Sequence, residues 1–313
     1  MTMSSVPLSQ RIAFVAMLVL IVGSPFILYP IFLMKILCFA LFAAAFNLLI
    51  GFVGLLSFGH AAYFGMGSYI AAHAAKVWGL TPELAILAGA AVAAVLGAAF
   101  GWLAIRRSGI YFAMITLALA QMVYFFCVQA PFTGGEDGIQ AVPRGHLFGV
   151  ISLANDRTLY WVVAAIFLAG FLFLYRVVHS PFGQVLKAIR ENEPRAVSLG
   201  YRVEDYKLIA FVLSAAMAGV AGGTKAIVFQ LATLTDVNWP MSGEAVLMTL
   251  VGGIGTIFGP PLGAVVIIAM QNELATLLGA WVTVVQGAIF VACVLAFRRG
   301  IIGELQAKLG KPL

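Results

Sequence analysis

The sequence predicts an all-α, polytopic membrane protein of about ten helical spans in two inverted halves, with both termini cytoplasmic. Three observations favour this fold class. Of the 313 residues, 63% are hydrophobic and only 10% are charged, whereas a soluble domain normally carries about 25% charged residues. Apolar runs of membrane-spanning length follow one another along almost the whole chain, and basic residues gather in alternate connections between them. We expect residues 1–313 to form a single transmembrane domain.

The expected spans are bounded by glycines, prolines or charged residues. The first apolar run is too long for a signal-peptide core and leads directly into the second, so we expect it to remain as a membrane span. In chain order the spans are expected at 12–34, 36–56, 57–78, 84–105, 109–130, 159–178, 207–230, 244–258, 260–278 and 280–297.

The basic residues set the expected orientation. Ten crossings that start from a cytoplasmic N-terminus place most of the 18 Lys and Arg residues inside, in agreement with the positive-inside rule. The connection 179–206 is then cytoplasmic and the connection 131–158 periplasmic. The basic residues left outside, or at the outer membrane edge, are Lys35, Lys76, Arg144, Arg157 and Lys225.

Two expected spans are poor continuous helices, because residues 51–67 contain five glycines and residues 252–263 contain five glycines and two prolines. They occupy equivalent places, the third and the eighth, in two halves of five. Paired interruptions in inverted halves point to a central substrate path, and close packing of helices through small residues is the alternative. The candidate path residues are Ser57, His60, Gly65, Gly67, Gly252, Gly253 and Gly255. His60 is equally well interpreted as a hydrogen-bonded packing residue.

The connection 179–206 is predicted to form two short helices. Ser180 and Pro181 are typical of a helix start, Asn192 or Glu193 can cap a second helix near Pro194, and Gly200 can end it. In the first helix an apolar stripe follows the spacing i, i+3, i+4 and i+7, formed by Phe182, Val185, Leu186 and Ile189. The stripe indicates a docking element for another protein, or a helix lying at the lipid interface.

Several kinds of chemistry are excluded. The chain lacks a G-x-x-x-x-G-K-[ST] loop, so it cannot bind ATP in that way. Its four histidines show no metal-ligand spacing, and no metal is expected. The three cysteines, Cys38, Cys127 and Cys293, lie far apart in apolar runs and are expected to be inert thiols. Lys225 is expected to extend its ammonium to the outer surface, with Glu244 as a possible ion-pair partner.

Five blocks carry a family resemblance. In order along the chain, the segments 54–69, 109–118, 133–138, 188–196 and 242–248 resemble the LivM-like permeases of bacterial branched-chain amino acid ABC importers. The resemblance extends over about residues 36–298. It implies a multi-pass subunit of the bacterial inner membrane that forms the translocation path with a second, homologous permease. Two ABC ATPase subunits and a periplasmic amino-acid-binding protein are the other implied partners.

The resemblance also assigns roles to residues. It identifies the coupling loop to the ATPase, for which the candidates are Lys187, Arg190, Glu191, Asn192, Glu193, Pro194, Ala196 and Gly200. Pro194 and Arg195 depart there from the usual pattern of such loops. Candidates for contact with the binding protein are Thr133, Gly134, Gly135, Glu136, Asp137 and Glu244.

The implied function is import of branched-chain or other small neutral amino acids, with no cofactor in this chain because the partner subunits use the ATP. The alternative is a secondary transporter driven by an ion gradient. Such a transporter normally needs carboxylates or histidines embedded in the membrane, and apart from Glu244 and His60 the chain offers few. A polytopic membrane enzyme is a third class, for which the sequence has no catalytic constellation.

Overall fold

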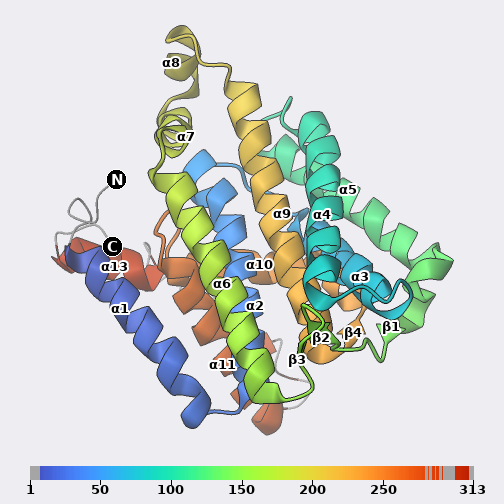
Figure 1. The fold of residues 1–313 in the computed structure, drawn as a ribbon. Coiled ribbons are helices and arrows are strands. Elements are labelled where there is room, and N and C mark those ends of the chain that lie inside the picture. The colour runs from blue at the N-terminus through green and yellow to red at the C-terminus, as the bar shows by residue number, and fades with distance from the viewer. Residues whose placement is uncertain are drawn as a thin grey trace.

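The computed structural model describes residues 8–278 and 300–309, together with residues 281, 284, 285, 287, 288 and 291. The described chain is a bundle of helices (Figure 1). In order these are α1 (Leu8–Gly23), α2 (Pro30–Asn47), α3 (His60–Lys76), α4 (Pro82–Ala104), α5 (Ile110–Gln129), α6 (Asp156–His179), α7 (Pro181–Glu191), α8 (Glu193–Ser198), α9 (Val203–Phe229), α10 (Trp239–Gly252), α11 (Gly259–Leu278) and α13 (Gly300–Leu309).

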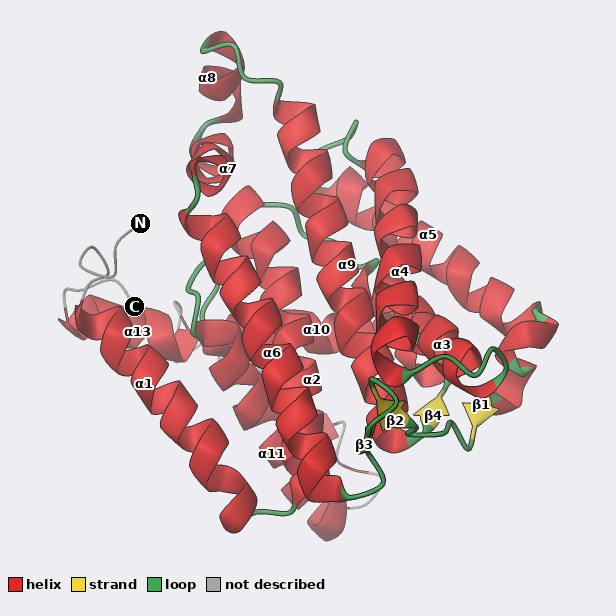
Figure 2. Ribbon diagram, viewed as in Figure 1, coloured by secondary structure: helices red, strands yellow, loops and turns green. Residues whose placement is uncertain are grey.

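Short elements connect the helices. A π-helical turn, η3 (Leu48–Val53), continues α2, and 3-10 turns occur at η2 (Ser24–Phe26), η4 (Pro131–Thr133), η5 (Gly135–Asp137) and η6 (Leu234–Asp236). The sequence predicted no strands, but β1 (Ile139–Gln140) pairs with β4 (Leu231–Ala232), and β2 (His146–Leu147) pairs with β3 (Ile151–Ser152), both antiparallel. Figure 2 shows these strands gathered at the end of the bundle away from α7 and α8. The connections 131–158 and 179–206 therefore lie at opposite ends, as the expected threading requires.

Five helices among the described residues are long and apolar enough to cross a membrane. They are Pro30–Val53, Pro82–Ala104, Ile110–Gln129, Asp156–His179 and Val203–Phe229. These correspond to five of the expected spans. The tenth expected span, 280–297, falls largely outside the described residues.

Three of the expected spans have different bounds in the structure. The first span was expected to run through residues 24–29, but the chain leaves the helix at Gly23 and starts α2 at Pro30. The residue before a proline is pushed out of the helical region, and Tyr29 is extended (φ −67°, ψ 128°). The third span begins as a helix only at His60, and the eighth runs from Trp239 to Gly252.

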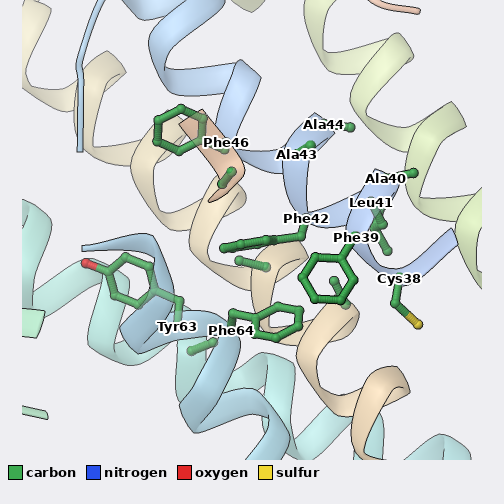
Figure 3. Packing of buried hydrophobic residues seen from close by; sticks show 14 of the residues in the cluster. Cys38, Phe39, Ala40, Leu41, Phe42, Ala43, Ala44, Phe46, Tyr63 and Phe64 are labelled. Carbon is green, nitrogen blue, oxygen red and sulfur yellow. The ribbon is translucent and has the colours of Figure 1, made fainter. Parts of the chain in front are cut away.

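The core surrounds α2, which is buried along almost its whole length between α6, α9, α10 and α11. Figure 3 shows its aromatic side chains meeting those of α3. The rings of Phe42 and Phe64 are 4.5 Å apart, and those of Phe39 and Phe64 5.7 Å apart. Lipid is as apolar as these side chains, so close packing itself holds the helices together.

The helices α3, α4 and α9 cross at glycines. A Cβ atom at Gly67 would lie 2.5 Å from the carbonyl oxygen of Gly219, and one at Gly89 would lie 2.5 Å from the carbonyl oxygen of Gly67. Real Cβ atoms do not come so close to a backbone atom. The three helices can therefore approach only because these residues lack a side chain.

Candidate functional site

The first glycine-rich segment contains one break, between α2 and α3. The π-helical turn η3 ends at Gly54, whose left-handed conformation (φ 83°) favours glycine. Residues 54–59 then form no helix, and α3 begins at His60. The predicted interruption is confirmed for residues 54–59, whereas Gly51 lies in η3 and Gly65 and Gly67 lie inside the regular helix α3.

The second glycine-rich segment contains a corresponding break between α10 and α11. Helix α10 ends at Gly252, and the turn that follows uses Gly253 (φ 125°) and Gly255 (φ 75°), both in conformations that favour glycine. Helix α11 begins at Gly259 with Pro260 and Pro261 in its first turn, where a missing N–H does no harm. This interruption is also confirmed.

Asn47, at the end of α2, joins the two breaks. Its Nδ2 donates to the carbonyl of Thr256 (2.8 Å), and its Oδ1 accepts from the backbone N–H of Gly255 (3.0 Å). Gly51 lies against the same turn, because a Cβ placed on it would be 2.8 Å from the nitrogen of Gly255. We call Asn47, Gly51, Gly255 and Thr256 the joint. The two glycine-rich segments therefore meet, whereas their predicted place near mid-membrane and along the substrate path stays a prediction.

Sequence reasoning missed Asn47 because only the glycines were considered in this region. A signal was present, since an amide in the middle of an apolar run must find hydrogen-bond partners in the interior. Asn47 is 3% exposed, and its partners are backbone groups more than 200 residues away in the chain.

Ser57 and His60, the polar candidates for the path, are both fully buried in tight packing. The backbone N–H of Gly59 donates to Ser57 Oγ (3.2 Å). His60 Nε2 forms a hydrogen bond with Ser214 Oγ (2.9 Å), and its ring meets the edge of Phe46 at 5.0 Å between centroids. This arrangement agrees with a packing role for His60.

The path glycines are also packed within the subunit. A Cβ on Gly65 would overlap Val237, and one on Gly252 would overlap the backbone of Gly259. Gly67 lies at the crossing of α3, α4 and α9. A cavity of about 570 Å³ does exist between α4, α6 and α9, and none of the candidate path residues lines it. Their role in translocation stays a prediction.

The connection 179–206 forms the two predicted helices, α7 and α8, which we call the hairpin. Both predicted caps are confirmed, since Ser180 Oγ accepts from the N–H of Gly183 (3.3 Å) and Asn192 Oδ1 from that of Arg195 (3.0 Å). Gly200 follows in a left-handed conformation (φ 89°).

Most of the apolar stripe of α7 packs against other residues of this subunit. Leu186 and Ile189 are buried, and Phe182 stacks on Tyr206 with 5.6 Å between ring centroids. Ile189 packs with Ala196 and Val203 in a small cluster. The stripe, predicted to dock on another protein or on lipid, is therefore largely covered by this chain's own residues, and the exposed side chains of the hairpin include both charged ones such as Glu191 and the apolar Val197 and Leu199.

The coupling-loop candidates divide into two groups. Four make contacts within the subunit: Lys187 lies over the ring of Phe52, Arg190 donates to Gly51, Glu193 pairs with Lys207, and Ala196 is buried. The exposed ones are Glu191, Asn192, Pro194 and Gly200, and Arg190 is exposed as well in spite of its contact with Gly51.

The binding-protein candidates lie in two places. Gly134 to Asp137 form a pair of tight turns, in which Glu136 and Asp137 are exposed. Thr133 is buried, with its Oγ1 donating to the carbonyls of Cys127 and Ala130 (both 2.6 Å). Glu244 is separate from this turn, on α10 beside Gln271 and Lys35. Contact with a binding protein stays a prediction.

Lys225 does not reach the outer surface, and that expectation was wrong. Its side chain is 11% exposed and its ammonium pairs with Asp236 (2.7 Å), which is 2% exposed. Asp236 takes the place expected for Glu244. A turn between α9 and η6 brings the two residues together, which no helical spacing could have revealed.

Comparison with known proteins identifies the family. Residues 29–294 match the family described as the branched-chain amino acid transport system permease component. The chain belongs to this family. The predicted resemblance is confirmed, and this permease is a transport subunit rather than an enzyme.

The permease has curated relatives of both kinds found in such systems. It is 26% identical over 290 residues to the high-affinity branched-chain amino acid transport system permease protein LivM of Escherichia coli (strain K12), covering 84% of the permease and 68% of the relative. It is 26% identical over 291 residues to LivH of the same strain, covering 85% and 91%. The solved structure of PsaBC from Streptococcus pneumoniae in complex with Fab is a distant likeness, with 15% identity, 88% and 94% coverage and a TM-score of 0.44.

Proposed function

We propose that this permease is a subunit of an ATP-driven importer of branched-chain or other small neutral amino acids in the bacterial inner membrane. The observation that carries the proposal is the family match over residues 29–294. The partners we propose are a second, homologous permease, two ABC ATPase subunits and a periplasmic amino-acid-binding protein. The likeness to both LivM and LivH supports the second permease.

The proposed topology has ten spans with both termini cytoplasmic. Its support is that the basic hairpin and the connection 131–158 lie at opposite ends of the bundle (Figure 1) and that the positive-inside rule assigns the basic end to the cytoplasm. The hairpin then meets the ATPases through its exposed residues, among them Glu191, Asn192 and Pro194. The exposed acids Glu136 and Asp137 face the periplasm, where the binding protein docks.

The proposed transport cycle needs no ion-binding carboxylate in this chain. ATP binding closes the ATPases and displaces the hairpin, and the displacement alternates access to a path between the two permeases. The buried acid Asp236 is already paired with Lys225 and is not available to carry an ion. The family match favours the ATP-driven function over the ion-gradient alternative.

The experiment is purification of the tagged permease from its native membrane, followed by reconstitution of the intact complex with its binding protein in proteoliposomes. We expect two ATPase chains and a second permease to co-purify, and uptake of labelled leucine to require ATP and to be blocked by vanadate. Collapse of ion gradients with ionophores leaves uptake unchanged. Uptake that follows an ion gradient without ATP would overturn the proposal.

A further inference from the structure

Arg190 is exposed on the hairpin, yet its guanidinium bonds to the end of the apolar helix Pro30–Val53, although the family resemblance assigned the residue to the ATPase interface. Its Nη1 donates to the carbonyl oxygen of Gly51, in the π-helical turn η3. One turn earlier on α7, the ammonium of Lys187 lies 5.7 Å from the ring centroid of Phe52 in the same π-helical turn. The helix α7 is therefore seated on η3 by two cations.

Two glycines make room for the arginine. A Cβ on Gly255 would lie 2.9 Å from Arg190 Nη1, and a Cβ on Gly54 would lie 3.2 Å from Arg190 Cγ. Both glycines have positive φ, 83° for Gly54 and 75° for Gly255. The guanidinium thus lies between the first break and the second, within reach of both.

A continuous chain of contacts leads from the hairpin to the second half of the subunit. Arg190 bonds to Gly51, Gly51 lies against Gly255, and Asn47 bonds to both Gly255 and Thr256. The joint is a place where displacement is possible, because residues 54–59 and 253–258 lie between helices rather than within them. Hinges commonly lie at such element ends, and π-helical turns are frequent at functional sites.

The hairpin itself is anchored as one unit. Glu193 on α8 pairs with Lys207 on α9 at 2.6 Å, and Phe182 stacks on Tyr206. Ile189 on α7 also packs with Ala196 on α8 and Val203 on α9. A push on the exposed end of the hairpin therefore moves α7 and α8 together with the start of α9, and Arg190 with them.

We propose that Arg190 is a positioning residue that transmits displacement of the hairpin to the joint and so to the α10–α11 turn. The proposal deepens the proposed function and rests on it, since it assigns to one side chain the step between the ATPase-facing loop and the membrane helices.

The experiment measures ATP hydrolysis and amino-acid uptake together, in proteoliposomes that hold the whole complex. The variants are Arg190→Ala, Arg190→Lys and, as the matched control, Arg107→Ala, which removes an exposed arginine from the α4–α5 connection. We expect Arg190→Ala to lower uptake per ATP hydrolysed about tenfold, the size of a typical coupling energy between sites, with hydrolysis nearly unchanged. The control is expected to match the wild type.

Arg190→Lys separates transmission from mere anchoring. A lysine retains a donor for the Gly51 carbonyl but lacks the planar guanidinium that lies beside Gly255, so we expect an intermediate ratio of uptake to hydrolysis. If Arg190→Ala does not assemble, the ratio of uptake to hydrolysis in Arg190→Lys still tests whether Arg190 transmits the displacement. A wild-type ratio in Arg190→Lys and Arg190→Ala, or parallel loss of uptake and hydrolysis in both, overturns the inference. A wild-type complex that imports no amino acid would instead overturn the proposed function.

Discussion

Lys225 on α9 and Asp236 in η6 form an ion pair inside the subunit, with 2.7 Å and 2.8 Å between the ammonium and the two carboxylate oxygens. The hydroxyl of Ser68 on α3 and the backbone N–H of Thr233 also donate to this carboxylate. The pair therefore ties the connection between α9 and α10 to two helices of the core. Neither charge reaches the surface.

Removal of one partner of this pair should destabilise the permease strongly. Asp236→Asn leaves a buried ammonium without its counter-charge, and we expect a loss of about 3–5 kcal/mol. The double variant Lys225→Met with Asp236→Leu should be closer to the wild type, because neither charge remains to be compensated. Thermal unfolding of the purified protein measures both.

The exposed pair Arg202–Asp205 supplies the control, with side chains 85% and 56% exposed. Arg202→Gln should change stability by only about 0–1 kcal/mol. Equal losses in the single and double variants of the buried pair would contradict the assignment.

Gly67→Ala should impair folding or assembly rather than transport. The added Cβ would lie 2.5 Å from the carbonyl oxygen of Gly219, and overpacking of this kind costs about 1–3 kcal/mol. Gly243→Ala is the matched control, since a Cβ there meets nothing within 4 Å. The yield and thermal stability of the two variants can be compared directly. A Gly67→Ala protein that is stable but does not transport would contradict the packing role and support a place for Gly67 in the substrate path.

Asn47→Ala should loosen the joint. It leaves the N–H of Gly255 and the carbonyl of Thr256 without their hydrogen-bond partner. We expect each unsatisfied buried group to lower the free energy of unfolding by about 1–3 kcal/mol. Gln121→Ala removes a comparable amide from α5 whose Nε2 has no hydrogen-bond partner, and it should cost less. The measurement is the difference in thermal stability between these variants. Equal losses would show that Asn47 contributes only its volume.

Glu191→Lys should weaken the attachment of the ATPase subunits. Glu191 is exposed at the end of α7, next to Asn192, which caps α8. Glu191→Gln removes the charge with little change in shape, so it is expected to have an intermediate effect if charge governs the contact. Co-purification of ATPase with the tagged permease measures attachment. Full recovery of ATPase with the lysine variant would place the interface elsewhere.

The proposed topology is tested by labelling single cysteines with an impermeant thiol reagent, in a chain whose three native cysteines are replaced. Glu136→Cys should be labelled from the periplasm and Leu199→Cys only after the membrane is opened, and both positions are exposed. Leu199 is preferable to Gly200, whose positive φ disfavours a side chain. Labelling of Leu199→Cys in sealed, right-side-out vesicles would reverse the threading.

Much of the local structure was predictable because it depends on neighbouring residues. Ser180 and Asn192 cap helices as their positions indicate, and Gly54 and Gly253 end helices inside the two predicted segments. The first boundary was wrong because hydropathy continues across Ser24–Pro30 although the backbone does not. Pro30 fixes where α2 starts, because its ring keeps the preceding residue out of the helical conformation. A count of apolar residues does not detect this steric effect.

The sequence by itself determined that this is a membrane protein, that its helices are interrupted at two paired places and that it belongs among the amino-acid permeases. These properties follow from hydrophobicity, from backbone conformation at glycine and proline, and from motif order, all of which are local. Only the tertiary structure decided that Lys225 meets Asp236, that Asn47 meets Gly255 and that Arg190 donates to the carbonyl of Gly51. Each of these contacts satisfies a buried polar group with a partner distant in the chain or across a turn, and packing of the whole bundle selects that partner.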